Sequence, residues 1–376
     1  DFPMDASIID EIRARYRHAL DRCDRDAAIA QPKAADAIDA EFVGAIGPAP
    51  SLATASFVLC IENNAIRNQA LLLCESIRRY AGRHRDAPIT AYAPRAGLGV
   101  DRETRAQLAD LGVDYVDEPL NAHCREYGSA NRVVAGAHAE RHGDSDFIIV
   151  LDSDTVWLDE PALPLDADAA LRAVDEKGSA TSGPDDYFEA YWRGLAALAG
   201  ISLDRLPWLV TTIGNERIRA SYNGGLIVVR RAAGILVRCA DLFAESVRAG
   251  LRPYRGTGID IVASTGSVGA AASAFWGSNQ AALALAAWSL QSHVRLYADR
   301  YNVPLHMLTE HGEIDPRWRA APPVHVHYHG MFDARRHEVA LDLIERLGVA
   351  EDRRQWLAAR IPLETYGVRG AEAVVR

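Results

Sequence analysis

The stretch Phe147 to Trp157, FIIVLDSDTVW, decides the fold of this chain. It begins with five apolar residues, four of them β-branched or aromatic, and such a run bounded by polar residues is typical of a buried central strand. Asp152 and Asp154 follow at its carboxyl end, which is the edge at which ligands bind in open α/β sheets. Two carboxylates so close together are costly unless a cation balances them. The stretch therefore predicts a divalent-cation site for a phosphorylated ligand, although an Asp-rich turn would contain the same residues.

The pattern before this stretch alternates between strands and helices. Buried strands are expected at 55–61, 89–93 and 113–116, and amphipathic helices at 66–81, 102–111 and 131–142. The order β-α-β-α-β-α-β predicts the α/β class with a mostly parallel central sheet flanked by helices. After Asp154 the pattern is less regular. It predicts strands at 226–230 and 324–330 and helices after 231, at 280–290 and around 339–347.

Composition limits the classes of function. The 376 residues are 49% hydrophobic and 24% charged, as in an ordinary globular protein, and the net charge of −10 argues against a nucleic-acid partner. Lys33 and Lys177 are the only lysines, so arginine, backbone N–H groups or a metal must contact any phosphate. The longest apolar region, Gly269–Leu290, is interrupted by polar residues, and no membrane span is expected.

The cysteines and the first residues bear on localisation. The five cysteines are odd in number and form no CxxC pair, so neither a disulfide framework nor a zinc site is expected. The first residues lack the basic and apolar regions of a signal peptide. We therefore expect a cytoplasmic protein.

Four elements together point to a family. They are the β/α half that begins at Ala55, the Asp-Ser-Asp sequence, Asn223-Gly224-Gly225 before a strand, and His327-Tyr328-His329-Gly330. Over residues 54–330 this arrangement resembles the GT-A (nucleotide-diphospho-sugar transferase) glycosyltransferases, and most of all glycosyltransferase family 8, which includes bacterial lipooligosaccharide galactosyltransferases and glycogenin. The resemblance implies a bacterial, metal-dependent enzyme that moves a hexose from a UDP-linked donor to a small-molecule, glycan or protein acceptor, with retention of configuration.

The resemblance also implies roles for particular residues. Asp152 and Asp154 would hold Mn²⁺, or Mg²⁺ in its place, together with the nucleotide, and His327 would complete the metal shell. Asn223 and Gly224 would contact the sugar, and Arg132 would lie near the donor. Asn279 and Gln280 would match the catalytic D-Q pair of the family, with Asn in place of Asp. Arg335 and Arg336 stand near the place of the family's lysine and would bind diphosphate. Asp185 and Asp186 would be candidate general bases if the enzyme inverts.

Domain boundaries and acceptor contacts follow from the same resemblance. We expect an N-terminal helical extension over 1–50, a catalytic domain over 51–330 with a donor half (51–158) and an acceptor half (159–330), and a C-terminal helical tail over 331–376. Trp192 and Trp276 are expected in the walls of the acceptor pocket, and the segment 256–269 is a possible lid or an ordinary surface loop.

Other interpretations remain open at this point. FIIVLDSDTV also fits haloacid-dehalogenase-like phosphatases, in which Asp152 would be the nucleophile and Asp154 the acid/base, but the required downstream lysine is missing from its expected order. A non-catalytic GT-A binding module is a second alternative. His325, His327 and His329 would share one face of a strand, where three histidines can bind zinc, although one metal ligand with two structural neighbours is favoured.

Overall fold

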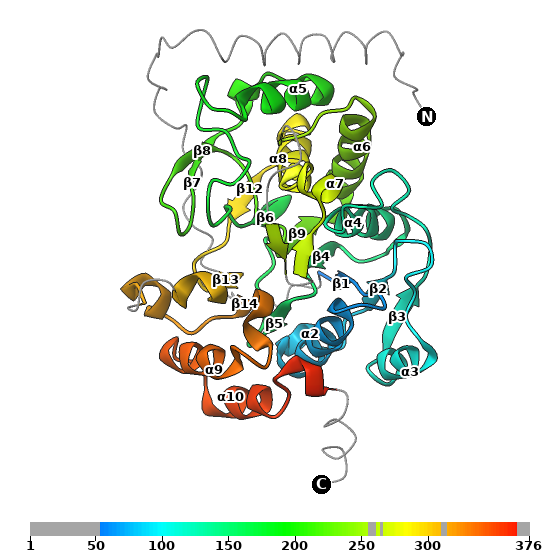
Figure 1. Cartoon of the computed structure of the whole chain (residues 1–376), viewed down its shortest axis with the longest axis vertical. Helices are drawn as coiled ribbons and strands as arrows, with labels where there is room; N and C mark the ends of the chain where they lie inside the picture. The colour runs from blue at the N-terminus through cyan, green and yellow to red at the C-terminus, as the bar shows by residue number, and fades with distance from the viewer. Residues whose placement is uncertain (1–52, 255–260, 264–265, 310–313, 367–376) are drawn as a thin grey trace.

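The computed structural model describes residues 53–254, 261–263, 266–309 and 314–366, so the extension expected over 1–50 lies outside the described residues. A seven-stranded sheet crosses the middle of the molecule in the order β12-β6-β9-β4-β1-β2-β3 (Figure 1). Its strands are β1 (Ala55–Cys60), β2 (Ile89–Tyr92), β3 (Val113–Val116), β4 (Phe147–Leu151), β6 (Ala169–Leu171), β9 (Leu226–Arg230) and β12 (Val294–Leu296). Of these, β9 alone runs antiparallel to its neighbours. The expected α/β class with a mostly parallel sheet is confirmed.

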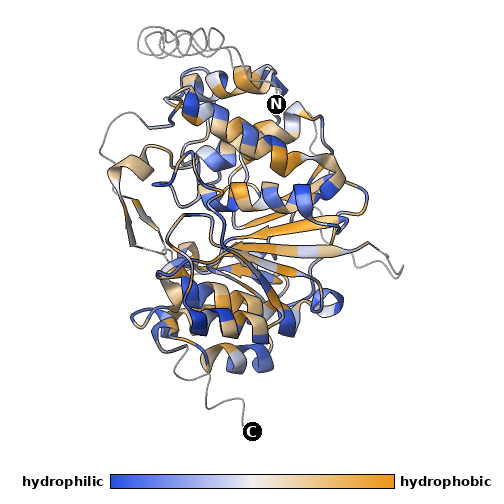
Figure 2. Cartoon of the chain, turned by 90° about the vertical axis from the view of Figure 1, so that its right-hand side faces the viewer, coloured by the Kyte–Doolittle hydropathy of each residue, from blue (hydrophilic) through white to orange (hydrophobic). Residues whose placement is uncertain are grey.

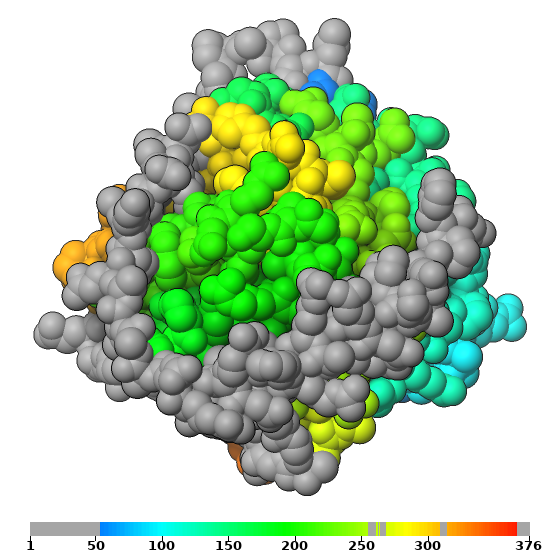
Figure 3. Space-filling model, turned by 90° about the horizontal axis from the view of Figure 1, so that it is seen from above, coloured from blue at the N-terminus to red at the C-terminus, as the bar shows by residue number. Residues whose placement is uncertain are grey.

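Helices cover both faces of this sheet (Figure 2). The helices are α2 (Ile66–Tyr80), α3 (Arg102–Asp110), α4 (Ala130–His142), α5 (Glu189–Ala199), α6 (Ile235–Arg248), α7 (Ala270–Ser273), α8 (Ser278–Ser289), α9 (His337–Arg346) and α10 (Glu351–Ala358). Seen from above, the part of the chain from α5 to α8 forms much of the surface at one end of the molecule (Figure 3). In the described part of the chain, none of the helices has the length and apolar character that crossing a membrane requires.

Side-chain alternation along the central strands places two cores on opposite faces of the main sheet. Ile148 and Val150 of β4 face the core that also contains the buried sides of α4, α6 and α8. Phe147 and Ile149 face the opposite core, against α2. Successive side chains of a strand point to opposite faces, so a strand covered on both faces must be apolar throughout. This is why β4 is buried along its whole length, as its sequence predicts.

A second, smaller sheet lies beside the end of β4. Its order is β13-β14-β5, with β13 at Val303–Pro304, β14 at His325–His327 and β5 at Thr155–Trp157. Strand β5 follows directly after Asp154, and its Thr155 pairs with His327 of the antiparallel β14. This register brings the late histidine segment to the acidic turn. The remaining short strands form two hairpins, β7 (Trp208–Val210) with β8 (Arg217–Arg219) and β10 (Ile261–Ala263) with β11 (Gly266–Val268).

Candidate active site

The acidic turn between β4 and β5 is held by hydrogen bonds that fix its two carboxylates in the lining of a pocket. The Ser153 hydroxyl donates to the carbonyl of Cys60 on β1. The Thr155 hydroxyl donates to the carbonyl of Asp152 over 2.7 Å. The Asp154 side chain is 4% exposed, whereas that of Asp152 is 35% exposed. The two carboxylates therefore differ in their access to solvent.

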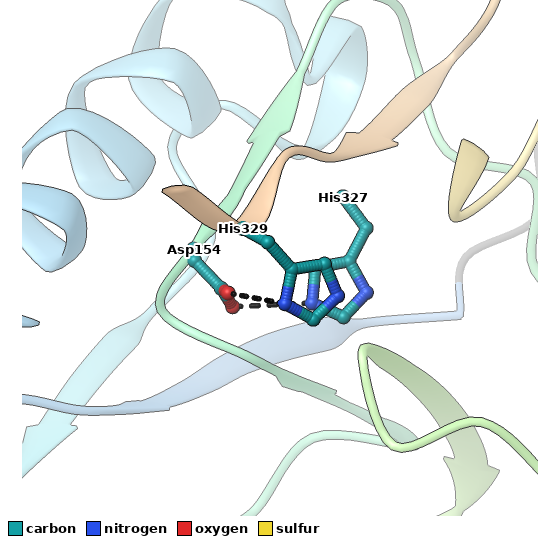
Figure 4. A group of neighbouring side chains, drawn as sticks. All are labelled: Asp154, His327 and His329. Carbon is teal, nitrogen blue, oxygen red and sulfur yellow. Dashed lines mark hydrogen bonds and ion pairs between the residues drawn. The ribbon is translucent and has the colours of Figure 1, made fainter. Parts of the chain in front are cut away.

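Two histidines share the buried Asp154 carboxylate (Figure 4). His327 Nε2 lies 3.2 Å from Asp154 Oδ1, and His329 Nδ1 lies 3.4 Å from Asp154 Oδ2. The two imidazole rings stack with centroids 4.1 Å apart and an interplanar angle of 19°. His327 Nε2 also lies 3.9 Å from Asp152 Oδ2. The expected pairing of His327 with the acidic turn is therefore present in the structure, and His329 joins it.

The position of His329 differs from the sequence expectation for a physical reason. Strand β14 ends at His327, and His329 begins the 3₁₀ turn η6 (His329–Phe332) with a φ of +47°. This left-handed backbone turns its ring back towards Asp154. The expectation that the strand continues to Gly330, with three histidines on one face, is therefore wrong. His325 is fully buried against the ring of Trp157, 4.5 Å between centroids, and takes no part in the cluster.

The charge state of the cluster follows from burial and from the carboxylates. Burial opposes protonation of His327, but the carboxylates of Asp154 and Asp152 outweigh it and raise its pKa. Burial, followed by the neighbouring His327, lowers the pKa of His329 to about 4. His329 therefore offers a neutral nitrogen lone pair at neutral pH.

The donor atoms of this cluster fit a divalent cation. One carboxylate oxygen of Asp154 and one ring nitrogen each from His327 and His329 lie within 4.8 Å of one another. A mixed set of carboxylate and imidazole ligands suits divalent transition metals such as Mn²⁺. The sequence did not predict that His329 belongs to this set of ligands.

Arg132 of α4 lies beside the same turn. Its Nη1 forms an ion pair with Asp152 Oδ2. Burial opposes its charge, yet the nearby Asp152 carboxylate helps to raise its pKa, so it stays a guanidinium. Its guanidinium packs on the backbone of Gly224, where an added Cβ would lie 2.7 Å from Arg132 Cζ. The glycine thus allows the close approach.

A cavity of about 340 Å³ opens over this turn, at the lower end of the size range of ligand pockets. The predicted site residues that line it are Arg132, Asp152, Asp154, Asn223, Gln280 and His327. Asn223 is held in place because its Nδ2 donates to Asp175 Oδ2 over 2.7 Å and its Oδ1 accepts from the Gly225 N–H. Trp276 also lines the cavity, as do Ala263, Val268 and Gly269 from the described part of the expected lid segment.

The structure leaves other predicted residues outside this cavity. Asn279 is buried, and its Oδ1 accepts a hydrogen bond of 2.7 Å from the Tyr127 hydroxyl. Trp192 is fully buried in the core and donates to the carbonyl of Ser179, so it cannot form an acceptor wall. The exposed residues Asp185, Arg335 and Arg336 do not line the cavity, and Asp186 pairs with Lys177 over 2.9 Å.

A buried polar cluster in the lining of the cavity was not predicted from the sequence. Glu62 follows β1, is fully buried, and accepts hydrogen bonds from Arg95 Nε at 2.9 Å and Asn131 Nδ2 at 3.0 Å. All three residues line the cavity. The signal was available in the sequence, because Glu62 stands at the carboxyl end of a predicted strand of the same sheet, as the acidic turn does.

Comparison with known proteins identifies the family. Residues 57–250, more than half of the chain, match the Rhodobacterales glycosyltransferase domain. The chain belongs to this glycosyltransferase family. The match runs from Phe57 within β1 through β4 and includes the acidic turn, Arg132 and Asn223, and it confirms the expected transferase. The haloacid-dehalogenase-like alternative is thereby set aside. In addition, Lys177, the one lysine downstream of the motif, is engaged with Asp186 outside the cavity.

Among the solved structures that are similar to this chain are two glycosyltransferases. One is the galactosyltransferase LgtC in complex with donor and acceptor sugar analogues, at 15% identity and a TM-score of 0.42, covering 80% of this chain and 99% of that one. Another is the bifunctional glycosyltransferase WbbM, at 13% identity and a TM-score of 0.46, covering 82% of this chain and 52% of that one. Both TM-scores are below 0.5, so the family assignment rests on the domain match alone. No curated protein matches the chain.

Proposed function

We propose that this glycosyltransferase moves a hexose from a nucleotide diphosphate sugar, with UDP as the nucleotide, to an acceptor hydroxyl with retention of configuration. The single observation that carries the proposal is the Asp154 carboxylate shared by His327 and His329 beside the Arg132–Asp152 ion pair, all in one cavity. Such a combination of metal-type ligands with a guanidinium suits the binding of a diphosphate.

The proposed cofactor is Mn²⁺, or Mg²⁺ in its place, held by Asp154 and His327 with Asp152 and His329 beside them. A divalent cation at this position would supply Lewis-acid stabilisation to the departing diphosphate. The chain itself contributes the guanidinium of Arg132, which bonds oxyanions through a planar array of donors. Because burial keeps this guanidinium in a fixed place, little reorganisation is needed when negative charge develops.

The sugar and the acceptor would occupy the part of the cavity that is lined by residues that follow Asp154 in the sequence. We propose that Asn223, which lines the cavity, contacts the sugar, with Gln280 beside the departing group. Gly224, expected to contact the sugar as well, does not line the cavity, and we propose that it acts through its close contact with Arg132. Trp276 is half-exposed in the cavity and offers an aromatic face to a sugar ring of a small-molecule, glycan or protein acceptor. We assign no catalytic role to Asp185, Asn279 or Arg335, because none of them lines the cavity.

The proposed halves of the catalytic domain, 51–158 and 159–330, both contribute to the cavity: Asp154 and Arg132 come from the first, Asn223 and His327 from the second. We further propose a cytoplasmic location. Its support is that the four cysteines of the described part, Cys60, Cys74, Cys124 and Cys239, are buried free thiols.

The test is a panel of sugar nucleotides assayed for hydrolysis and transfer with Mn²⁺, with Mg²⁺ and with EDTA. We expect turnover of a UDP-hexose that depends on the metal, with retained anomeric configuration by ¹H NMR. Asp154→Asn should abolish it, whereas Asp110→Asn on the exposed surface of α3 is the matched control. Equal turnover in EDTA, or unchanged turnover in Asp154→Asn, would contradict the proposed site.

A further inference from the structure

Two side chains come unusually close to Gly225, in the space that a side chain at this position would fill. A Cβ added at Gly225 would lie 2.3 Å from Asn302 Oδ1 and 2.6 Å from His327 Nδ1. The two atoms therefore share the space that a side chain at position 225 would fill. One of them belongs to the ring whose other nitrogen, Nε2, faces Asp154.

Asn302 is an unusual residue in its own right. It is fully buried and has a φ of +51°, in the left-handed region. Its Oδ1 and Nδ2 both have no hydrogen-bond partner within the described residues, and the same holds for His327 Nδ1. Buried polar atoms without a partner are rare in folded proteins, so the two that face Gly225, Asn302 Oδ1 and His327 Nδ1, require an explanation.

Strand pairing places Asn302 at this point. It directly precedes β13, in which Val303 pairs with Val326 and Pro304 pairs with His327 of the parallel β14. The register of two neighbouring strands thus brings the amide and the imidazole to the same side of Gly225. The buried position is set by backbone hydrogen bonds and not by the side chain's own contacts.

The chemistry of imidazole explains why an amide oxygen is useful here. When one ring nitrogen binds a metal, the other carries a proton and needs an acceptor, which fixes the tautomer and the orientation of the ring. Asn302 Oδ1 is a buried acceptor without a partner among the described residues, and it lies on the same side of Gly225 as Nδ1.

We propose that Asn302 is a positioning residue for His327. Its Oδ1 accepts the Nδ1 proton, which leaves Nε2 directed at Asp154 as a metal ligand, and Gly225 is required because any larger residue would separate the two groups. The proposal rests on the proposed function to the extent that His327 binds the metal. It adds a residue that neither the sequence motif nor the family match assigns.

Asn302→Gly is the informative variant, since glycine accepts the left-handed backbone and removes only the amide. Asn215→Gly is the matched control, because Asn215 is exposed and has a φ of +54°. Asn302→Asp keeps an acceptor oxygen at the same place and serves as the rescue variant. All are studied in the full chain, with Mn²⁺ alone as the probe, by electron paramagnetic resonance of the free ion.

We expect Asn302→Gly to weaken Mn²⁺ binding by about 10- to 100-fold, the usual effect of losing a partner of a metal-bound histidine. Asn215→Gly should change nothing, and Asn302→Asp should bind more tightly than Asn302→Gly. Unchanged Mn²⁺ affinity in Asn302→Gly, or an equal loss in the aspartate variant, would overturn the proposal.

A second measurement keeps the two proposals apart. In ¹⁵N-histidine-labelled, metal-free protein, the His327 Nδ1 proton should exchange slowly with water in the wild type and quickly in Asn302→Gly. If this holds while the wild type binds no Mn²⁺, the metal site is wrong but the positioning role stands. If the proton is absent, or exchanges at the same rate in both proteins, Asn302 does not position His327.

Discussion

Replacing Arg132 by methionine should change metal binding and nucleotide binding in opposite directions. Methionine keeps much of the length of the side chain and removes its charge. In the structure the guanidinium is paired with Asp152 and is 12% exposed, and the same guanidinium is proposed to bind the donor diphosphate. Its loss frees a carboxylate for the cation, but it also removes a donor of charged hydrogen bonds to the nucleotide.

The expected magnitudes differ because the two interactions differ in solvent exposure. Asp152 is 35% exposed, so solvent screens its ion pair, which we value at about 1 kcal/mol at most; its loss should strengthen binding of Mn²⁺ alone by up to about fivefold. A hydrogen bond from a charged donor to diphosphate contributes about 1.5–3 kcal/mol. Its loss should weaken UDP binding in saturating Mn²⁺ by about 10- to 100-fold.

Titration calorimetry with UDP, together with electron paramagnetic resonance of Mn²⁺, measures both effects on the same protein. Arg132→Lys is the matched control, since it keeps the charge but loses the planar guanidinium, and it should retain the wild-type affinity for Mn²⁺. A variant Arg132→Met that binds UDP as tightly as the wild type would refute the assignment of this residue to the diphosphate. Weaker binding of both ligands would show that the residue only supports the fold of the site.

Four further substitutions test separate parts of the structure. Gly224→Ala puts a Cβ 2.7 Å from Arg132 Cζ and should lower UDP affinity by calorimetry at an almost unchanged Tm; an unchanged affinity would argue against the close approach. Trp276→Ala should lower the rate of transfer more than the rate of donor hydrolysis, because Trp276 lines the cavity. Trp192 is fully buried, so Trp192→Ala should reduce the free energy of unfolding, measured in urea, by about 3–5 kcal/mol; the reverse pattern would contradict the placement of the two rings. Burial opposes the charge of Glu75, but hydrogen bonds from three side chains of the C-terminal segment lower its pKa, so its contribution to stability is present above the ordinary carboxyl pKa and is lost as the pH falls. Glu75→Gln should therefore lower the free energy of unfolding by about 2 kcal/mol at pH 7 and by less at pH 3, and a loss of stability that does not depend on pH would exclude the ionic contribution.

The features that sequence predicts well are those in which one segment determines its own environment. The run Phe147–Leu151 can be buried on both faces only in the middle of a covered sheet, and its place before two aspartates put the site at a strand end. The alternating β/α pattern before it fixes a parallel arrangement, because parallel strands need helical crossovers. The expected α/β sheet and the glycosyltransferase assignment both followed from such local patterns.

Contacts between segments that are distant in the sequence could not be predicted from local patterns. Trp192 and Trp276 look alike in the sequence, since each stands in an aromatic segment after Asp154, yet one is buried in the core and the other lines the cavity. The exposed Arg335 follows the histidine motif closely but does not line the cavity. Their positions depend on how α5, α8 and the C-terminal helices pack, and no periodicity in one segment reports that packing.

The two kinds of missed residue show where a sequence argument can still be improved. Glu62 obeys the same rule as Asp152, because it ends a strand of the same parallel sheet, and applying that rule to every strand would have placed it at the cavity. His329 and Asn302 obey no such rule. Each takes a left-handed backbone at a residue other than glycine. The strand expected over 324–330 predicts the opposite conformation at His329, and no pattern in the sequence singles out Asn302. Strained residues of this kind persist where the surrounding structure holds them in place, so finding two of them beside one metal-type cluster is itself an argument that this cluster is the functional centre.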